Sequence, residues 1–85
     1  MAGKLPGLDR RMSRRERLSV RAKAMIADAR VNCVIRDRSV GGARLVFAEA
    51  LDLPPRFTIV EEVNGVRREV MLIWASPMEA GVAFI

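Results

Sequence analysis

The sequence contains no histidine and no tyrosine, and Cys33 is its one cysteine. Histidine-based acid–base catalysis, thiol catalysis and zinc binding depend on residues that are missing or, for Cys33, set among apolar neighbours. Serines are present, but none lies in the Gly-x-Ser-x-Gly turn that exposes the nucleophile of α/β-hydrolases. The composition therefore predicts a protein that is not an enzyme and that carries no metal and no cofactor.

Long apolar runs are also missing. The longest, Val70–Ala75, is far shorter than the ~20 residues of a membrane span. The basic residues near the start are followed by an alternating segment and not by the apolar stretch of a secretory signal. A lone cysteine cannot form an intrachain disulfide, so Cys33 is predicted to be a small buried hydrophobic residue. We expect a cytoplasmic, single-domain protein of 85 residues with no membrane span.

The chain carries 15 Lys and Arg against 10 Asp and Glu, a net charge of +5, and the excess lies at its start. Residues 1–23 have eight basic and two acidic side chains, whereas residues 24–85 have seven and eight. This asymmetry predicts a basic arm, residues 1–16, ahead of a body, residues 17–85. A basic arm indicates an anionic partner, whether nucleic acid, a membrane surface or a phosphate-bearing ligand, or else a solvated tail. The predominance of arginine favours recognition, because the planar guanidinium suits paired hydrogen bonds to phosphate.

From Val20 onward, apolar and polar residues alternate with the period of two that is typical of half-buried β-strands. The pattern predicts six strands, over residues 20–26, 31–36, 43–47, 57–63, 66–75 and 81–85. A sheet this small must roll up to bury its apolar face. We therefore expect an all-β fold: a six-stranded antiparallel β-barrel with a flexible basic N-terminal arm and no C-terminal helix.

Turn residues separate the predicted strands. The first hairpin is expected to turn at residues 28–30, and a proline-marked crossing at 51–55 to move the chain to another edge of the sheet. Asn64-Gly65 predicts a type I′ hairpin turn, in which both residues have positive φ. In the strand predicted before this turn, residues 57–63, Val63 is expected to lie on the same face as Phe57. Trp74 follows three apolar residues and is predicted to belong to the core rather than to offer a stacking platform.

Two motifs flank the first predicted hairpin: Arg10-Arg11-x-x-Arg14-Arg15 precedes it and Asp37-x-Ser39-x-x-Gly42 follows it. Together they resemble the signature of PilZ domains, the receptors of cyclic di-GMP, in which an Arg-x-x-x-Arg arm and an Asp/Asn-x-Ser-x-x-Gly turn are separated by one β-hairpin. Other segments extend the resemblance over nearly the whole chain from Asp9: Gly42-Ala43-Arg44-Leu45, Leu53-Pro54-Pro55-Arg56-Phe57, Ile73-Trp74 and Gly81-Val82-Ala83-Phe84.

The resemblance implies a cyclic di-GMP site that contains seven residues: Arg10, Arg11, Arg14, Arg15, Asp37, Ser39 and Gly42. Their chemistry suits this ligand. Arginine can bind phosphate or the O6 and N7 atoms of guanine and can stack on a purine. A carboxylate accepts guanine N–H groups, and a hydroxyl donates or accepts. The glycine leaves room for a ring or for a tight turn.

Three Arg-x-x-x-Arg pairs overlap near the start of the barrel. Counting back from the Asp-x-Ser-x-x-Gly turn over a hairpin of ordinary length favours Arg11 with Arg15 as the main pair. Arg17 and Arg21 lie close to the first strand, and Arg21 is expected on its outer face. We therefore interpret these two as charges that shape the local field.

The leading hypothesis is a receptor domain in which cyclic di-GMP orders the arm and so signals to an effector protein that the sequence does not identify. A small barrel that binds nucleic acid is an alternative, but three Phe, one Trp and no Tyr supply few platforms for bases, and no specific nucleic acid is expected. A ligand-free PilZ-like adaptor that acts through protein contacts is another alternative. The presence of both motifs favours the receptor.

Overall fold

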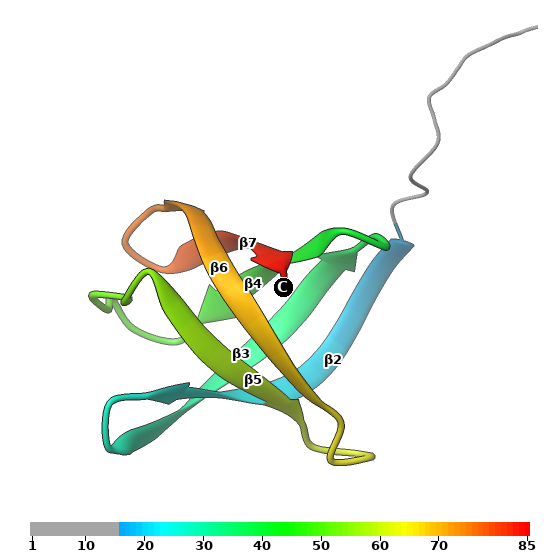
Figure 1. Ribbon diagram of the computed structural model, residues 1–85, viewed down its shortest axis with the longest axis horizontal. Helices are drawn as coiled ribbons and strands as arrows, with labels where there is room; N and C mark the ends of the chain where they lie inside the picture. Colours follow the sequence, from blue (N-terminus) through cyan, green and yellow to red (C-terminus); the bar gives the residue numbers. More distant parts are fainter. Residues whose placement is uncertain (1–15) are drawn as a thin grey trace, which may run out of the picture.

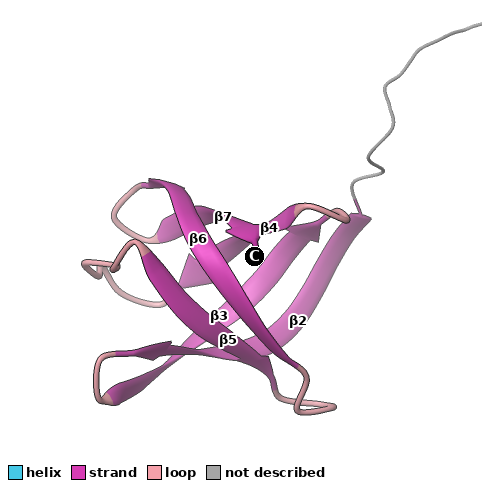
Figure 2. Cartoon of the chain, viewed as in Figure 1, coloured by secondary structure: helices cyan, strands magenta, loops and turns pink. Residues whose placement is uncertain are grey.

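The structure is a computed structural model that describes residues 16–85 of the chain. Six strands occupy most of this part: β2 (Glu16–Ile26), β3 (Ala29–Arg38), β4 (Gly42–Phe47), β5 (Arg56–Glu61), β6 (Arg67–Ala75) and β7 (Glu79–Phe84). All neighbouring strands are antiparallel, and they close in the order β2-β3-β4-β7-β6-β5 (Figures 1 and 2). Residues 16–85 form no helix, and this part of the chain therefore has no helix that could cross a membrane. The predicted six-stranded antiparallel barrel is confirmed.

Closure of the barrel depends on two pairings between strands that are distant in sequence. The segment between β4 and β5 crosses the end of the barrel, with Leu51 and Leu53 packed against the core. β4 therefore pairs with β7 and not with β5, its successor in sequence. β5 then pairs with β2, from Ala22 opposite Glu61 to Met25 opposite Thr58, and this contact completes the ring.

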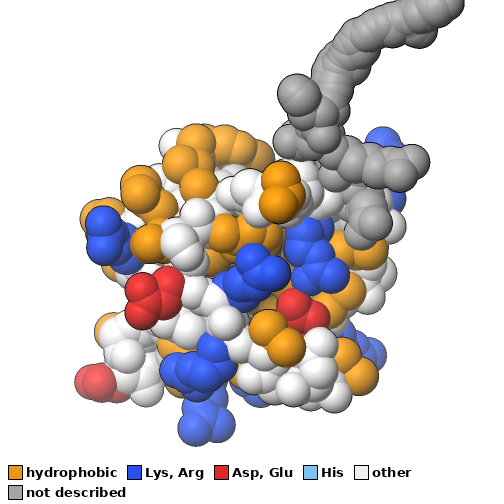
Figure 3. Space-filling view, turned by 45° about the vertical axis from the view of Figure 1, so that its right-hand side comes forward, with side chains coloured by type: hydrophobic (Ala, Val, Ile, Leu, Met, Phe, Trp, Pro, Cys, Tyr) orange, Lys and Arg blue, Asp and Glu red, His pale blue; other side chains and the backbone are white. Residues whose placement is uncertain are grey.

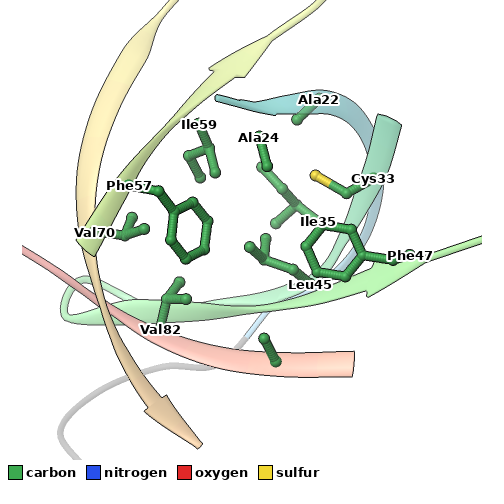
Figure 4. Packing of buried hydrophobic residues seen from close by; sticks show 11 residues of the cluster. Ala22, Ala24, Cys33, Ile35, Leu45, Phe47, Phe57, Ile59, Val70 and Val82 are labelled. Atoms are coloured by element: carbon green, nitrogen blue, oxygen red, sulfur yellow. The ribbon is translucent and has the colours of Figure 1, made fainter. Parts of the chain in front are cut away.

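Inward-facing side chains from all six strands fill the interior (Figure 4). The buried hydrophobic residues are Ala22, Ala24, Cys33, Ile35, Leu45, Phe47, Phe57, Ile59, Val70, Ala80 and Val82. They recur at every second position, because the pleat sends alternate side chains to opposite faces of the sheet. The prediction of a buried Cys33 is confirmed, and burial, together with the Glu62 carboxylate, raises the pKa of its thiol to about 11.

Several local predictions were wrong, and a side-chain hydrogen bond explains the error at Asn64-Gly65. The chain turns at Ala27 and Asp28 rather than at 28–30, with Ala27 at a φ of 53°. Asn64-Gly65 does not form a type I′ turn, because Gly65 has a positive φ of 71° but Asn64 does not. The Asn64 side chain instead accepts a hydrogen bond from the Val66 amide at 2.9 Å.

The hairpin that contains Asn64 is consequently longer than a two-residue turn. The Glu61 amide donates to the Val66 carbonyl and the Gly65 amide to the Glu61 carbonyl, both at 2.9 Å. Val63 lies in this loop and is 85% exposed, so it is not part of the buried face as predicted. β2 also begins at Glu16, four residues before the alternating pattern that predicted it.

Candidate ligand-binding site

The Asp-x-Ser-x-x-Gly turn connects β3 to β4 at the end of the barrel where β2 begins (Figure 1). The Ser39 amide donates to the Gly42 carbonyl at 2.9 Å, which closes the turn. The Phe84 amide donates to the Gly41 carbonyl at 2.9 Å, which attaches the turn to β7. Three predicted site residues, Asp37, Ser39 and Gly42, line a single hollow of about 360 Å³. This volume lies within the range of small-molecule sites.

The hollow has a polar side and an apolar side. Its lining residues are Asp37, Arg38, Ser39, Gly42, Ala43, Arg44, Ile73, Trp74, Gly81 and Val82. Figure 3 turns the end of the barrel that carries the β3–β4 turn toward the viewer, and basic side chains lie there beside acidic and exposed hydrophobic ones. Charged groups that can bind phosphate therefore lie close to apolar surface that can contact a base.

Four residues of this surface form one row across the outside of the barrel. Asp37 of β3 pairs with Arg44 of β4, Arg44 with Gly81 of β7, and Gly81 with Trp74 of β6. Two β-bulges produce this arrangement, one between Ile35 and Asp37 and one between Leu72 and Trp74. In a regular strand, residues two positions apart, such as Ile35 and Asp37, face the same side of the sheet. Each bulge turns the later residue, Asp37 or Trp74, outward.

The prediction that Trp74 belongs to the core was wrong, because the bulge at Ile73 reverses the face of the strand. Trp74 is 46% exposed. Its indole lies over Gly81, where an added Cβ would overlap the indole nitrogen. Because Gly81 has no side chain, the indole covers this part of the row and forms an apolar floor beside Arg44.

Gly42 has a structural role that differs from the predicted ones. Its φ is not positive, so it is not required as a left-handed turn residue. A Cβ at this position would instead overlap the carbonyl oxygen of Val82. Gly42 therefore allows β4 to approach β7 closely at the edge of the hollow.

Ion pairs fix the polar side chains of the hollow. Arg44 Nε donates to Asp37 Oδ2 at 2.6 Å, and Arg44 Nη1 donates to Glu79 Oε1 at 2.9 Å. These hydrogen bonds, first to Asp37 and then to Glu79, raise the pKa of Arg44 above its ordinary value. Arg38 faces the interior instead and donates to Glu61 Oε2 at 3.0 Å. The Asp37 carboxylate, with 16% of its side chain exposed, is therefore held in a defined orientation.

The predicted site residues Arg10, Arg11, Arg14 and Arg15 lie outside the described residues. Arg17, which follows them, pairs in register with Asp37 and so continues the row onto β2. Arg21 is exposed on the outer face of β2, as predicted. Sequence reasoning did not identify Arg44 or Trp74 as site residues. Both lie within segments that carry the family resemblance, but the bulge that exposes Trp74 has no clear sequence signal.

The described residues form a closed six-stranded antiparallel β-barrel with a hollow beside the β3–β4 turn. The sequence model of the PilZ domain family matches residues 9–85. This match covers most of the chain, which therefore belongs to the PilZ family, a family of receptor domains for cyclic di-GMP. Comparison with curated proteins gives no match.

Proposed function

We propose that this PilZ domain binds cyclic di-GMP in the hollow beside the β3–β4 turn. The observation that carries the proposal is that Asp37 and Ser39 line one hollow while Asp37 pairs with Arg17, close to the point where the basic arm joins the barrel. The acidic, hydroxyl and basic groups that a guanine dinucleotide requires are thus concentrated at one end of the molecule.

The side chains of the hollow match the parts of the ligand. The Asp37 carboxylate can accept guanine N–H groups, and the Ser39 hydroxyl can donate to phosphate or accept from a base. Trp74 lies in the same hollow and offers an exposed aromatic face on which a purine stacks. Base–aromatic stacking contributes about 1 to 3 kcal/mol per base.

In this proposal Arg11 and Arg15 are the main phosphate- or guanine-binding pair, with Arg10 and Arg14 beside them. The length of an extended chain limits their distance from Arg17 to about 7 Å for the backbone of Arg15 and about 22 Å for that of Arg11. The ligand gives these charges fixed partners, and the part of the arm that precedes β2 becomes ordered over the hollow. The new surface is then available to an effector in the cytoplasm, and the domain acts as a receptor without catalysis.

Calorimetric titration with cyclic di-GMP tests the proposal directly. We expect saturable binding that Arg11→Ala or Arg15→Ala weakens by about 1.5 to 3 kcal/mol, the range for hydrogen bonds to charged groups. Arg30→Ala is the matched control, because Arg30 is exposed in the β2–β3 hairpin at the opposite end of the barrel. We expect Arg30→Ala to leave the affinity unchanged.

Titration with duplex DNA separates this function from nonspecific binding of nucleic acid. DNA binding is expected to be weak and to fall steeply with salt, because it depends on the neutralisation of phosphates by the basic side chains. Binding of DNA in moderate salt without any response to cyclic di-GMP would contradict the proposed function.

A further inference from the structure

Arg44 lies between Asp37 and Trp74, the two residues that we propose to contact the guanine base. In the row across the barrel, Asp37 is its direct partner on β3, and Trp74 lies two strands away on β6 with its indole over the intervening Gly81. Arg44, Asp37 and Trp74 line the same hollow. A purine that rests on the Trp74 indole and reaches toward β3 therefore presents an edge to the Arg44–Asp37 pair.

The Arg44–Asp37 pair offers a donor beside an acceptor. A guanidinium group carries five N–H donors. In Arg44, Nε donates to Asp37 and Nη1 donates to Glu79. The remaining N–H groups of the guanidinium fork can therefore donate to a ligand. The two carboxylates also fix the direction of the fork. Arg44 has 36% of its side chain exposed, which leaves it accessible from the hollow.

This arrangement is complementary to guanine and opposed to adenine. Guanine presents the acceptors O6 and N7 beside the donors N1–H and N2–H₂, whereas adenine places the donor N6–H₂ where guanine has O6. An arginine that donates to O6 while a neighbouring carboxylate accepts from N1–H satisfies guanine. Adenine at the same place would bring N6–H₂ against the arginine donors and its N1 acceptor against the carboxylate.

We propose that Arg44 determines the base specificity of this site, by donating to O6 or N7 of a guanine that rests on Trp74 while holding Asp37 in position to accept from the same base. The inference rests on the proposed function, since it names a further residue of that site. The ion pair is partly exposed, with 36% of the Arg44 and 16% of the Asp37 side chain accessible, so its loss should destabilise the fold less than loss of a fully buried pair. A variant without the Arg44 side chain should therefore still fold, and the ratio of its affinities for two dinucleotides separates recognition from stability.

The experiment compares cyclic di-GMP with cyclic di-AMP by calorimetry on the full chain. The wild type should prefer cyclic di-GMP. In Arg44→Met, the affinity for cyclic di-GMP should fall by about 10- to 100-fold, the range for loss of a paired contact to a base, whereas the affinity for cyclic di-AMP should change little. Arg30→Met, at the opposite end of the barrel, should keep the wild-type affinities and preference.

Arg44→Lys is a second variant that keeps the positive charge but not the planar fork, and it should also lose most of the preference for guanine. It also tests the inference if Arg44→Met does not fold. An equal loss of affinity for both dinucleotides would assign Arg44 a structural role and overturn the inference. Retention of the wild-type preference in either folded variant would overturn it as well. A wild type that binds neither dinucleotide would instead contradict the proposed function.

Discussion

At the scale of single residues, Gly81 decides where Trp74 lies. The indole occupies the space above the glycine, and an added Cβ would overlap it. The expected result of Gly81→Ala is that the indole moves away, because a well-packed neighbour tolerates no added methyl group without displacement. Cyclic di-GMP affinity should then fall by about tenfold or more as the stacking contact is lost.

Tryptophan fluorescence provides the structural measurement for Gly81→Ala, since Trp74 is the sole tryptophan and the chain has no tyrosine. Its emission should shift in the variant. Gly41→Ala is the matched control for the emission: apart from its chain neighbours, no residue has an atom within 4 Å of a Cβ at this position, and its φ is not positive. Normal emission and normal affinity in Gly81→Ala would show that the indole does not depend on the glycine.

Cys33 should make the stability of the fold depend on alkaline pH. Burial is the main cause that raises the pKa of its thiol from 9.0 to about 11, so the folded protein holds this proton more tightly than the unfolded chain does. The contribution of the protonated Cys33 thiol to the free energy of unfolding is complete below pH 9. As the pH rises toward 11, this contribution falls by on the order of 2 kcal/mol. Urea unfolding from pH 8 to 11 measures it.

Cys33→Ala is the reference for this measurement, because the other alkaline groups titrate equally in both proteins. The difference in unfolding free energy between wild type and variant should narrow between pH 9 and 11. A constant difference over this range would mean that the folded and unfolded thiols share one pKa.

At the scale of elements, an ion pair connects the end of β3 to the end of β5. Arg38 follows the bulge in β3 and turns inward, and Glu61 continues the buried face of Phe57 and Ile59. Their side chains, 29% and 10% exposed, meet at 3.0 Å. The pair thus joins the turn that carries Ser39 to β5, and so connects the two strands that flank β2.

Loss of either partner should leave the other charge poorly solvated. We expect Arg38→Met or Glu61→Met to lower the free energy of unfolding by about 1 to 3 kcal/mol, less than for a fully buried pair because Arg38 is partly exposed. The double variant Arg38→Met/Glu61→Met should recover most of the loss. Urea unfolding of the four proteins forms a double-mutant cycle.

The exposed pair between Lys23 and Glu62 is the control for this cycle. These side chains are each 38% exposed and meet at 3.3 Å, so Lys23→Met should cost less than about 1 kcal/mol. If the Arg38 and Glu61 variants cost no more than Lys23→Met, the β3–β5 ion pair is not a structural connection.

At the scale of the whole molecule, the barrel separates a site end from a hairpin end (Figure 1). The β3–β4 turn and the end of β7 are joined by the Phe84–Gly41 hydrogen bond, whereas the β2–β3 hairpin lies opposite. Cyclic di-GMP should therefore slow amide hydrogen exchange of Ser39 and Phe84, because it stabilises the turn locally. Exchange in the exposed hairpin at Ala27–Ala29 should not change.

NMR-detected exchange with and without saturating cyclic di-GMP measures this difference, and residues 9–17 should also gain protection if the arm becomes ordered as proposed. Unchanged Ser39 and Phe84 amides at saturation would place the ligand elsewhere. Equal slowing of both ends would mean that these amides exchange by global unfolding and would contradict a local effect.

Local sequence pattern by itself determined the class of the fold and the place of the turn motif. Alternation such as that of Cys33 and Ile35 predicts a strand with one buried face, because the pleat repeats every two residues whatever the partner strand is. The Asp37 and Ser39 turn was likewise predicted, because Asp, Ser and Gly favour turns through local hydrogen bonds. Both features depend on neighbours in the chain.

Only the tertiary structure decided the strand order, the exposure of Trp74 and the position of Arg44. The β4–β7 and β2–β5 pairings join segments distant in sequence, so no local pattern encodes them. The β6 bulge reverses the face of the strand after Leu72, and its backbone register is set by pairing with β7. Arg44 lies in one row with Asp37 and Trp74 because three separate strand pairings, β3–β4, β4–β7 and β7–β6, bring these residues together, so the row exists only in the assembled sheet.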